Sequence, residues 1–222
     1  MPHAVYCVLK VQGIADHLLN NAVKITVGKG GDRLTANKSV TQRVHVVEAR
    51  ARLEKFKALM QPFRRGGQHA GKRVIVFANM KLTVKKLASW CSSQGMASDS
   101  ISGDRSQSQR ETTIRKFKEG KVTVVIATDV AARGLDIKGI ERVINYELPV
   151  DDFQDYVHRI GRTGRAGAAG ESDSLYTDGD RKHAPALIKI MKDAGQSIPA
   201  EFARCAPQKT TFDSDSDDDR YN

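Results

Sequence analysis

The chain has 222 residues, of which 40% are hydrophobic and 28% are charged, and its formal net charge is +10. This length allows one well-packed domain with extensions, since a domain usually takes about 100 to 200 residues. The basic balance favours a polyanionic partner, nucleic acid before a membrane surface, although a basic surface can also serve solubility alone. No apolar stretch reaches the ~18 to 20 residues that a membrane-spanning helix needs.

The cysteines Cys7, Cys91 and Cys205 have neither an even number nor the spacing of metal ligands. We therefore expect free thiols in a reducing compartment. The apolar run Ala4–Leu9 has no basic flank before it and no clear cleavage site after it, so no signal peptide is predicted. The expected location is the nucleus or the cytoplasm, without a membrane.

Residues 1–39 show two short elements ahead of the main domain. The apolar positions of Ile14–Leu19 predict a short helix, and Val23–Val27 alternates like a strand before a glycine turn. A strand without a neighbour leaves its hydrogen-bonding edges unpaired. We therefore expect residues 1–39 to be loosely held.

The main domain is predicted to begin with the alternating strand Val40–Val46 and a helix over residues 49–60. Gly66–Lys72 then imitates a phosphate-binding P-loop, but Arg73 stands where that motif needs Ser or Thr for Mg²⁺. A P-loop also follows a strand and precedes a helix, whereas this segment follows a helix and precedes the apolar run Val74–Ala78. It is interpreted as a basic loop.

Short apolar runs at Val74–Ala78, Val122–Ala127 and Val143–Tyr146 are β-branched and do not alternate. This pattern is typical of strands covered on both faces of a parallel sheet. Asn79 follows the first run, where it could cap the next helix, and Thr128–Asp136 follows the second. Ligands of open α/β sheets bind outside the carboxyl ends of the strands, so we expect a binding site there.

A later helix is predicted to begin with the capping box Ser106-x-x-Gln109, which places Gln107 and Arg110 in its first turn. Another helix is predicted to end at Gly161, after apolar positions spaced i, i+3, i+4 and i+7: Phe153, Tyr156, Val157 and Ile160.

Arg162 and Arg165 follow that helix with only small neighbours, Gly, Thr and Ala. Planar guanidiniums suit a phosphate, and arginine fingers use this chemistry. A solvated basic loop is the alternative for an isolated Arg-x-x-Arg pair.

Two long segments carry a specific resemblance. Ala127–Asp136, ATDVAARGLD, and His158–Gly167, HRIGRTGRAG, resemble the fifth and sixth helicase motifs of DEAD-box RNA helicases. The resemblance implies an α/β fold, a RecA-like three-layer sandwich with a mainly parallel sheet flanked by helices. Residues 40–205 would form the C-terminal helicase domain, and residues 1–39 the end of the first domain plus a linker. Residues 206–222, rich in Ser and Asp, are predicted to be a disordered acidic tail.

The resemblance implies a role for each matching residue. Arg162 and Arg165 would be catalytic arginine fingers that bind nucleotide together with Gly134 and Asp136, although Asp136 could be a plain turn former. His158 and Arg159 would face the first domain. Contacts with the RNA backbone are implied for Asn79, Gln107, Arg110, Thr128 and Arg133. No metal ligand is expected in this chain.

The implied function is that of the C-terminal half of an ATP-dependent RNA helicase that unwinds short duplexes. ATP and Mg²⁺ would be its cofactors, RNA and the first RecA-like domain its partners, and the protein a monomer. The chain shows no valid P-loop, no Asp-Glu-Ala-Asp quartet and no Ser-Ala-Thr triplet. Alone, it is predicted to bind no nucleotide tightly and to hydrolyse no ATP. A stand-alone RNA- or protein-binding regulatory module is the alternative.

One segment departs from the family's pattern. Members usually continue after the sixth motif with a mostly apolar strand, whereas Gly170–Tyr176 is polar. We therefore predict that this last strand is short, frayed or at an edge. Asp180–Ala194 is predicted to be a helix that ends at Gly195.

Overall fold

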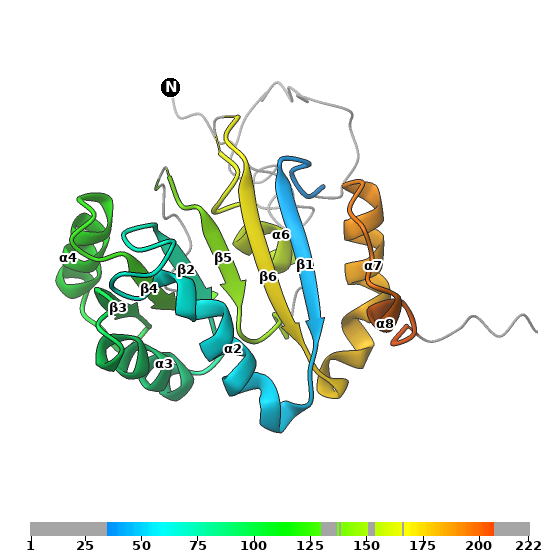
Figure 1. Cartoon of the computed structure of the whole chain (residues 1–222), viewed down its shortest axis with the longest axis horizontal. Coiled ribbons are helices and arrows are strands. Elements are labelled where there is room, and N and C mark those ends of the chain that lie inside the picture. The colour runs from blue at the N-terminus through cyan, green and yellow to red at the C-terminus, as the bar shows by residue number, and fades with distance from the viewer. Residues whose placement is uncertain (1–34, 130–136, 138, 151–153, 166, 207–222) are drawn as a thin grey trace, which may run out of the picture. The chain divides into compact units, whose positions relative to one another are not determined.

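Six parallel strands form one sheet in the order β1-β6-β5-β2-β4-β3 (Figure 1). The structure is a computed structural model that describes residues 35–129, 137, 139–150, 154–165 and 167–206. The strands are β1 (Val40–Val46), β2 (Val74–Phe77), β3 (Ser98–Ile101), β4 (Val124–Ala127), β5 (Arg142–Asn145) and β6 (Gly170–Tyr176).

Helices cover both faces of this sheet. They are α2 (Arg52–Met60), α3 (Lys81–Ser93), α4 (Gln107–Lys118), α6 (Gln154–Ile160), α7 (Ala184–Asp193) and α8 (Ala200–Ala203). Short 3₁₀ turns lie at η1 (Ala49–Ala51), η2 (Gln61–Phe63) and η3 (Asp178–His183). In Figure 1, α2 lies in front of the sheet, α6 lies behind it, and α7 and α8 lie beside β1. The predicted RecA-like three-layer fold is confirmed.

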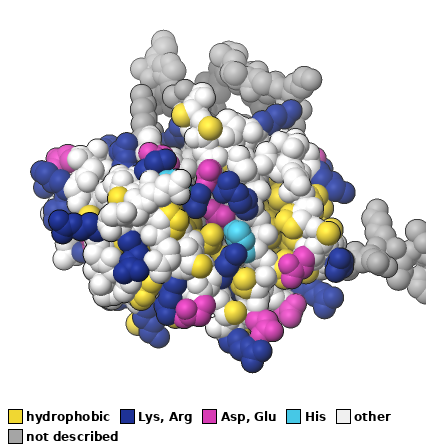
Figure 2. Space-filling view, viewed as in Figure 1, with side chains coloured by type: hydrophobic (Ala, Val, Ile, Leu, Met, Phe, Trp, Pro, Cys, Tyr) yellow, Lys and Arg dark blue, Asp and Glu magenta, His cyan; other side chains and the backbone are white. Residues whose placement is uncertain are grey.

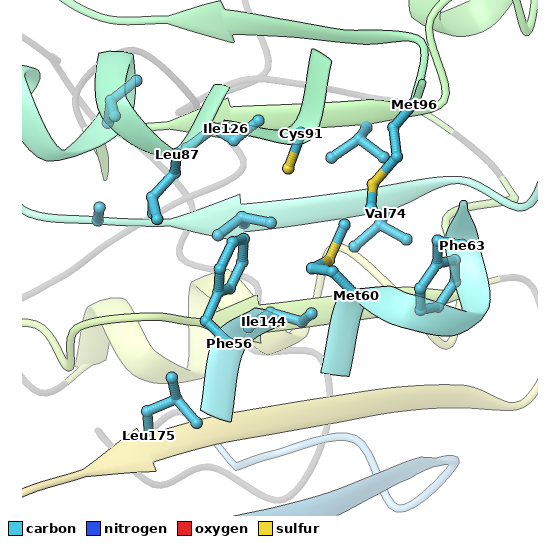
Figure 3. Packing of buried hydrophobic residues seen from close by; sticks show 14 residues of the cluster. Phe56, Met60, Phe63, Val74, Leu87, Cys91, Met96, Ile126, Ile144 and Leu175 are labelled. Atoms are coloured by element: carbon cyan, nitrogen blue, oxygen red, sulfur yellow. The ribbon is translucent and has the colours of Figure 1, made fainter. Parts of the chain in front are cut away.

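The face under α2 and α3 holds one hydrophobic cluster (Figure 3). Phe56 and Met60 of α2 and Cys91 of α3 are fully buried against strand residues that include Ile126 and Ile144. Burial raises the pKa of the Cys91 thiol to about 12, which keeps it protonated and unreactive. A second cluster on the opposite face includes Phe77 of β2, Phe117 of α4 and Val143 of β5. Two covered faces account for the apolar strands without alternation.

Several sequence predictions are confirmed. The strands at β1, β2, β4 and β5 form where the apolar runs predicted them. The capping box at the start of α4 is present, because Ser106 Oγ accepts from Gln109 N and Gln109 Oε1 accepts from Ser106 N. Gly195 ends the last long helix with a φ of +69°. The segment Gly66–Lys72 is a turn-rich loop ahead of β2.

The prediction for the last strand was wrong. β6 is seven residues long and pairs with β1 on one side and β5 on the other. Two of its buried polar side chains, Asp173 and Ser174, have side-chain partners on the neighbouring strands, which helps to stabilise a polar interior strand. Asn145 Nδ2 donates to Ser174 Oγ at 3.0 Å, and the Tyr156 hydroxyl donates to Gln42 Oε1 at 3.0 Å on the neighbouring strand.

The face of β6 opposite Ser172 and Ser174 carries a charge cluster. We define this charge cluster as Arg43, His45, Arg142, Glu171 and Asp173. His45 Nε2 lies 2.8 Å from Asp173 Oδ1, and Arg43 Nη1 donates to Glu171 Oε2 at 3.0 Å. Arg142 also bonds to Glu171 and stacks over a phenylalanine ring. Figure 2 shows charged side chains of both signs and a histidine near the middle of this face. Opposite charges stand where the resembled pattern usually has apolar side chains.

This charge cluster predicts an acid-sensitive contribution to stability. Hydrogen bonding to Arg43, and then to Arg142, lowers the pKa of Glu171 from 4.5 to about 2. A lowered pKa stabilises the fold above pH 4.5, and this contribution is lost as the pH falls toward 2. In Glu171→Gln, the free energy of unfolding should therefore fall less steeply across this range, as urea titrations at stepped pH would measure. Parallel losses in both proteins would contradict the expectation.

Some predictions fall on residues that the structure does not describe. Residues 1–34 and 207–222 lie outside the described residues, so the short helix, the strand and the acidic tail predicted there stay predictions. Within the described part of the chain, no helix has the length and apolarity that a bilayer span requires.

Candidate functional site

The carboxyl ends of β2, β4 and β5 bring three polar residues together. Asn79 follows β2, Asp129 follows β4, and Glu147 follows β5. The Asn79 backbone N–H donates to Glu147 Oε2 at 2.7 Å, and Asn79 Nδ2 donates to the Leu148 carbonyl at 2.8 Å. The loops after β2 and β5 are therefore joined at the edge where α/β sheets bind ligands.

Arg159 ties these three strand ends to α6. Its side chain is only 1% exposed, and its Cζ lies 5.2 Å from the centre of the Phe77 ring. Nε and Nη2 donate to the two carboxylate oxygens of Asp129 at 2.6 and 2.5 Å. Nη2 also donates to Asn79 Oδ1 at 2.9 Å, and Nη1 to the Glu147 carbonyl at 2.5 Å. This is the forked geometry that arginine makes with a carboxylate.

These contacts bear on three sequence predictions. The Arg159 side chain is buried against its own domain, and the interdomain role predicted for it stays a prediction. Asn79 does not cap α3, because the N-cap residue is Met80 and it makes no side-chain cap bond. Both polar atoms of the Asn79 amide bond within the domain, and its predicted RNA contact stays a prediction. His158, whose side chain is 40% exposed, keeps its interdomain role as a prediction.

Arg162 and Arg165 lie just past the end of α6, and both are partly exposed. Arg162 Nε donates to the His158 carbonyl at 3.2 Å, and Arg165 Nε donates to the Gly161 carbonyl at 2.9 Å. Each guanidinium is thus held to the backbone four residues earlier. Such fixed placement is what a transition-state contact requires.

The loop that carries the two arginines packs at the amino ends of the strands, not at the carboxyl edge. The buried Thr163 hydroxyl donates to the carbonyl of Ile140 at 2.5 Å and lies 3.2 Å from that of Glu141, just ahead of β5. Ile140 stands four residues after Asp136 in the sequence.

The start of α4 carries two residues that were predicted to contact the RNA backbone, Gln107 and Arg110. Gln107 is exposed, and Arg110 Nη1 donates to Gln107 Oε1 at 3.3 Å, so these two residues lie together. Thr128 is partly exposed just beyond β4, and its backbone N–H donates to the Ile101 carbonyl at the end of β3. Because α4 follows β3, its amino end also lies on the carboxyl side of the sheet, and a helix start favours an anion.

Three of the predicted site residues, Arg133, Gly134 and Asp136, lie outside the described residues, so their roles stay predictions. Among the residues that are described, no group of His, Cys, Asp or Glu side chains could hold a metal ion.

Sequence reasoning missed Asp129, Glu147 and Thr163. Asp129 lies inside the fifth-motif segment, and its place directly after a strand was an available signal. Thr163 was read only as a small neighbour of the arginines, although it anchors their loop. Glu147 has no signal in a single sequence beyond its position after β5.

Comparison with known families matches residues 52–167 to the helicase conserved C-terminal domain. The chain is 43% identical over 196 residues to DEAD-box ATP-dependent RNA helicase 14 of Arabidopsis thaliana, covering 88% of this chain and 30% of that protein. It is 40% identical over 195 residues to ATP-dependent RNA helicase DBP2 of Scheffersomyces stipitis, covering 88% of this chain and 36% of the relative. The chain thus spans about a third of these relatives' length.

The fold has solved counterparts as well. The crystal structure of a DEAD box protein from the hyperthermophile Methanococcus jannaschii matches 85% of this chain and 47% of that chain. The TM-score is 0.60 and the sequence identity is 32%.

Proposed function

We infer what this chain does from the family to which it belongs, the helicase C-terminal domains of DEAD-box RNA helicases. We propose that it forms the second RecA-like domain of an ATP-dependent RNA helicase. In the complete enzyme it would close on a first helicase domain, hold RNA by its backbone and help to hydrolyse ATP.

The observation that carries this proposal is the arginine loop. Arg162 and Arg165 stand three residues apart after α6, each held at Nε by a backbone carbonyl. Guanidiniums placed in this way can stabilise the negative charge that spreads over a transferring phosphoryl group. The surrounding residues supply little but backbone, so a nucleotide could approach closely. Gly134 and Asp136 would contact the same nucleotide.

The carboxyl edge of the sheet suits an RNA backbone. Gln107 and Arg110 lie in the first turn of α4, and Thr128 lies partly exposed beyond β4. Hydroxyl, amide and guanidinium groups contact phosphate and sugar without reading bases. We therefore propose these residues, together with Arg133, as backbone contacts, so the RNA would be bound without base specificity.

The ATP and the Mg²⁺ would be held mainly by the first helicase domain. When bound, the metal neutralises charge on the phosphates. This chain would contribute the two arginines from the opposite wall of the nucleotide site, and His158 would face the partner domain. The close match to complete helicases does not favour a stand-alone regulatory module.

Reconstitution tests this proposal. The chain would be mixed with a separately produced first helicase domain of a DEAD-box protein, ATP, Mg²⁺ and single-stranded RNA. We expect ATP hydrolysis that needs both proteins and rises with RNA, and no turnover by the chain alone. The supplied domain, joined to its own second domain, is the positive control. RNA-stimulated turnover by the chain alone would contradict the proposal, as would inactivity of the mixture when that control is active.

A further inference from the structure

A turn at residues 37–39 contacts the loop between the two arginines. Asn37 Nδ2 donates to the Gly164 carbonyl oxygen at 2.7 Å, and Ser39 Oγ donates to the same oxygen at 3.2 Å. Asn37 also shapes the turn, because its Oδ1 accepts from Ser39 N at 3.0 Å and its carbonyl accepts from Val40 N at 3.1 Å. A single side chain therefore holds both the turn and the loop.

Gly164 fits tightly against this turn. Its φ is +67°, and a Cβ at this position would lie 2.5 Å from Val40 Cγ2 and 3.0 Å from Ser39 Oγ. Only glycine meets both requirements without displacing its neighbours. The Gly170 backbone N–H donates to the Ser39 carbonyl at 3.0 Å, which ties down the far end of the loop. Together with the Thr163 bonds, these contacts hold the loop on two sides.

We propose that Asn37 and Ser39 are positioning residues for Arg162 and Arg165. This inference rests on the proposed function, in which those arginines contact the nucleotide. The turn stands directly ahead of β1, at the end of the segment predicted to link the two helicase domains. A displacement of that link would act on the Gly164 carbonyl and, through it, on both guanidiniums. The link would thereby make the position of the arginines depend on how the two domains are arranged.

Small displacements matter for such residues. A shift of about 1 Å in a catalytic group can cost roughly 10²-fold in rate. Asn37 and Ser39 do not need to touch the nucleotide to influence its hydrolysis. They need only keep the Gly164 carbonyl, and therefore the backbone on either side of it, in one place.

Hydrogen exchange of the chain by itself tests the contact. Asn37→Asp keeps the acceptor that forms the turn but removes the donor to Gly164, and Ser39→Ala removes the second donor. In either variant, the amides of Arg162 and Thr163 should exchange roughly fivefold faster, as expected for one lost hydrogen bond. Ser39→Thr keeps a hydroxyl and should restore slow exchange. Ser93→Ala is the matched control, because Ser93 Oγ bonds to a carbonyl at the exposed end of α3.

Kinetics with a first helicase domain test the positioning role. In Asn37→Asp, kcat for RNA-stimulated ATP hydrolysis should fall by about tenfold to 10²-fold. KM for ATP should change by less than about twofold, because the lost interaction belongs to the transition state. A general loss of folding would instead lower the active fraction and the melting temperature together.

The outcomes separate this inference from the proposed function. Unchanged exchange at Arg162 and Thr163 in both variants would overturn it. So would an unchanged kcat in Asn37→Asp when Arg162→Ala lowers kcat. If Arg162→Ala leaves kcat unchanged, the proposed function and the positioning role built on it both fail. In that case, amide hydrogen exchange of the chain by itself would still show whether the turn holds the arginine loop.

Discussion

Arg162→Ala is expected to lower RNA-stimulated ATP hydrolysis by about 10³-fold or more when the chain works with a first helicase domain. An arginine finger meets charge that develops mainly in the transition state, so the loss should appear in kcat rather than in KM. Arg165→Ala should act in the same direction. Arg162→Lys keeps the charge but loses the planar fork, and should recover only part of the rate.

A matched control separates this effect from a general loss of positive charge. Arg204 is exposed near the end of α8 and has no proposed role in binding, so Arg204→Ala should leave kcat unchanged. The melting temperature of Arg162→Ala should stay near that of the parent, since its Nε bond to the His158 carbonyl lies on a partly exposed side chain. An Arg162→Ala protein with the parent's kcat would contradict the assignment.

The apolar strands could be predicted because their physical signal is local. Val74–Phe77 and Val124–Ala127 are buried on both faces, and that burial demands a continuous β-branched run. The start of α4 was predictable for a similar reason, since Ser106 and Gln109 satisfy each other within a single turn.

The polar strands could not be predicted, because their stability comes from distant partners. β6 is held by residues of β1 and β5 that are far from it in sequence, such as Gln42, which lies opposite Ser172, and Asn145. β3 is an edge strand that pairs with β4, in a register that sets Ser98 opposite Val124. Pairings over such separations leave no periodic pattern in the strand itself.

The candidate site was predicted in part. The two arginines after α6 were named from the sequence and their catalytic role stays a prediction, whereas the burial of Arg159 against its own domain was not foreseen. Its place on the helix did carry a signal: Tyr156, Arg159 and Ile160 are spaced i, i+3 and i+4, which puts them on one face, and all three are buried. The turn at Asn37 had no signal, because its target is the backbone of Gly164.

Asp129→Ala is expected to give the largest loss of stability, about 3 to 5 kcal/mol in the free energy of unfolding. The reason is the state of Arg159, which is 1% exposed and would keep its charge without its carboxylate partner. Among the described residues, the oxygens of Asn79 and Glu147 would remain as its acceptors. Urea unfolding should show a lower midpoint with an unchanged m-value. Asp193→Ala, which breaks the exposed pair with Lys189, should cost no more than about 0.5 kcal/mol.

A double variant distinguishes a buried charge from simple loss of packing. In Asp129→Ala with Arg159→Met, no charge is left in the interior, and the methionine can still pack against the Phe77 ring. We therefore expect the double variant to be more stable than Asp129→Ala alone, because removing both members of a buried pair costs less than removing one. Equal or greater destabilisation would mean that Arg159 holds the strand ends through its bonds to Asn79 and Glu147. A loss below about 1 kcal/mol in the single variant would show that water or another acceptor replaces Asp129.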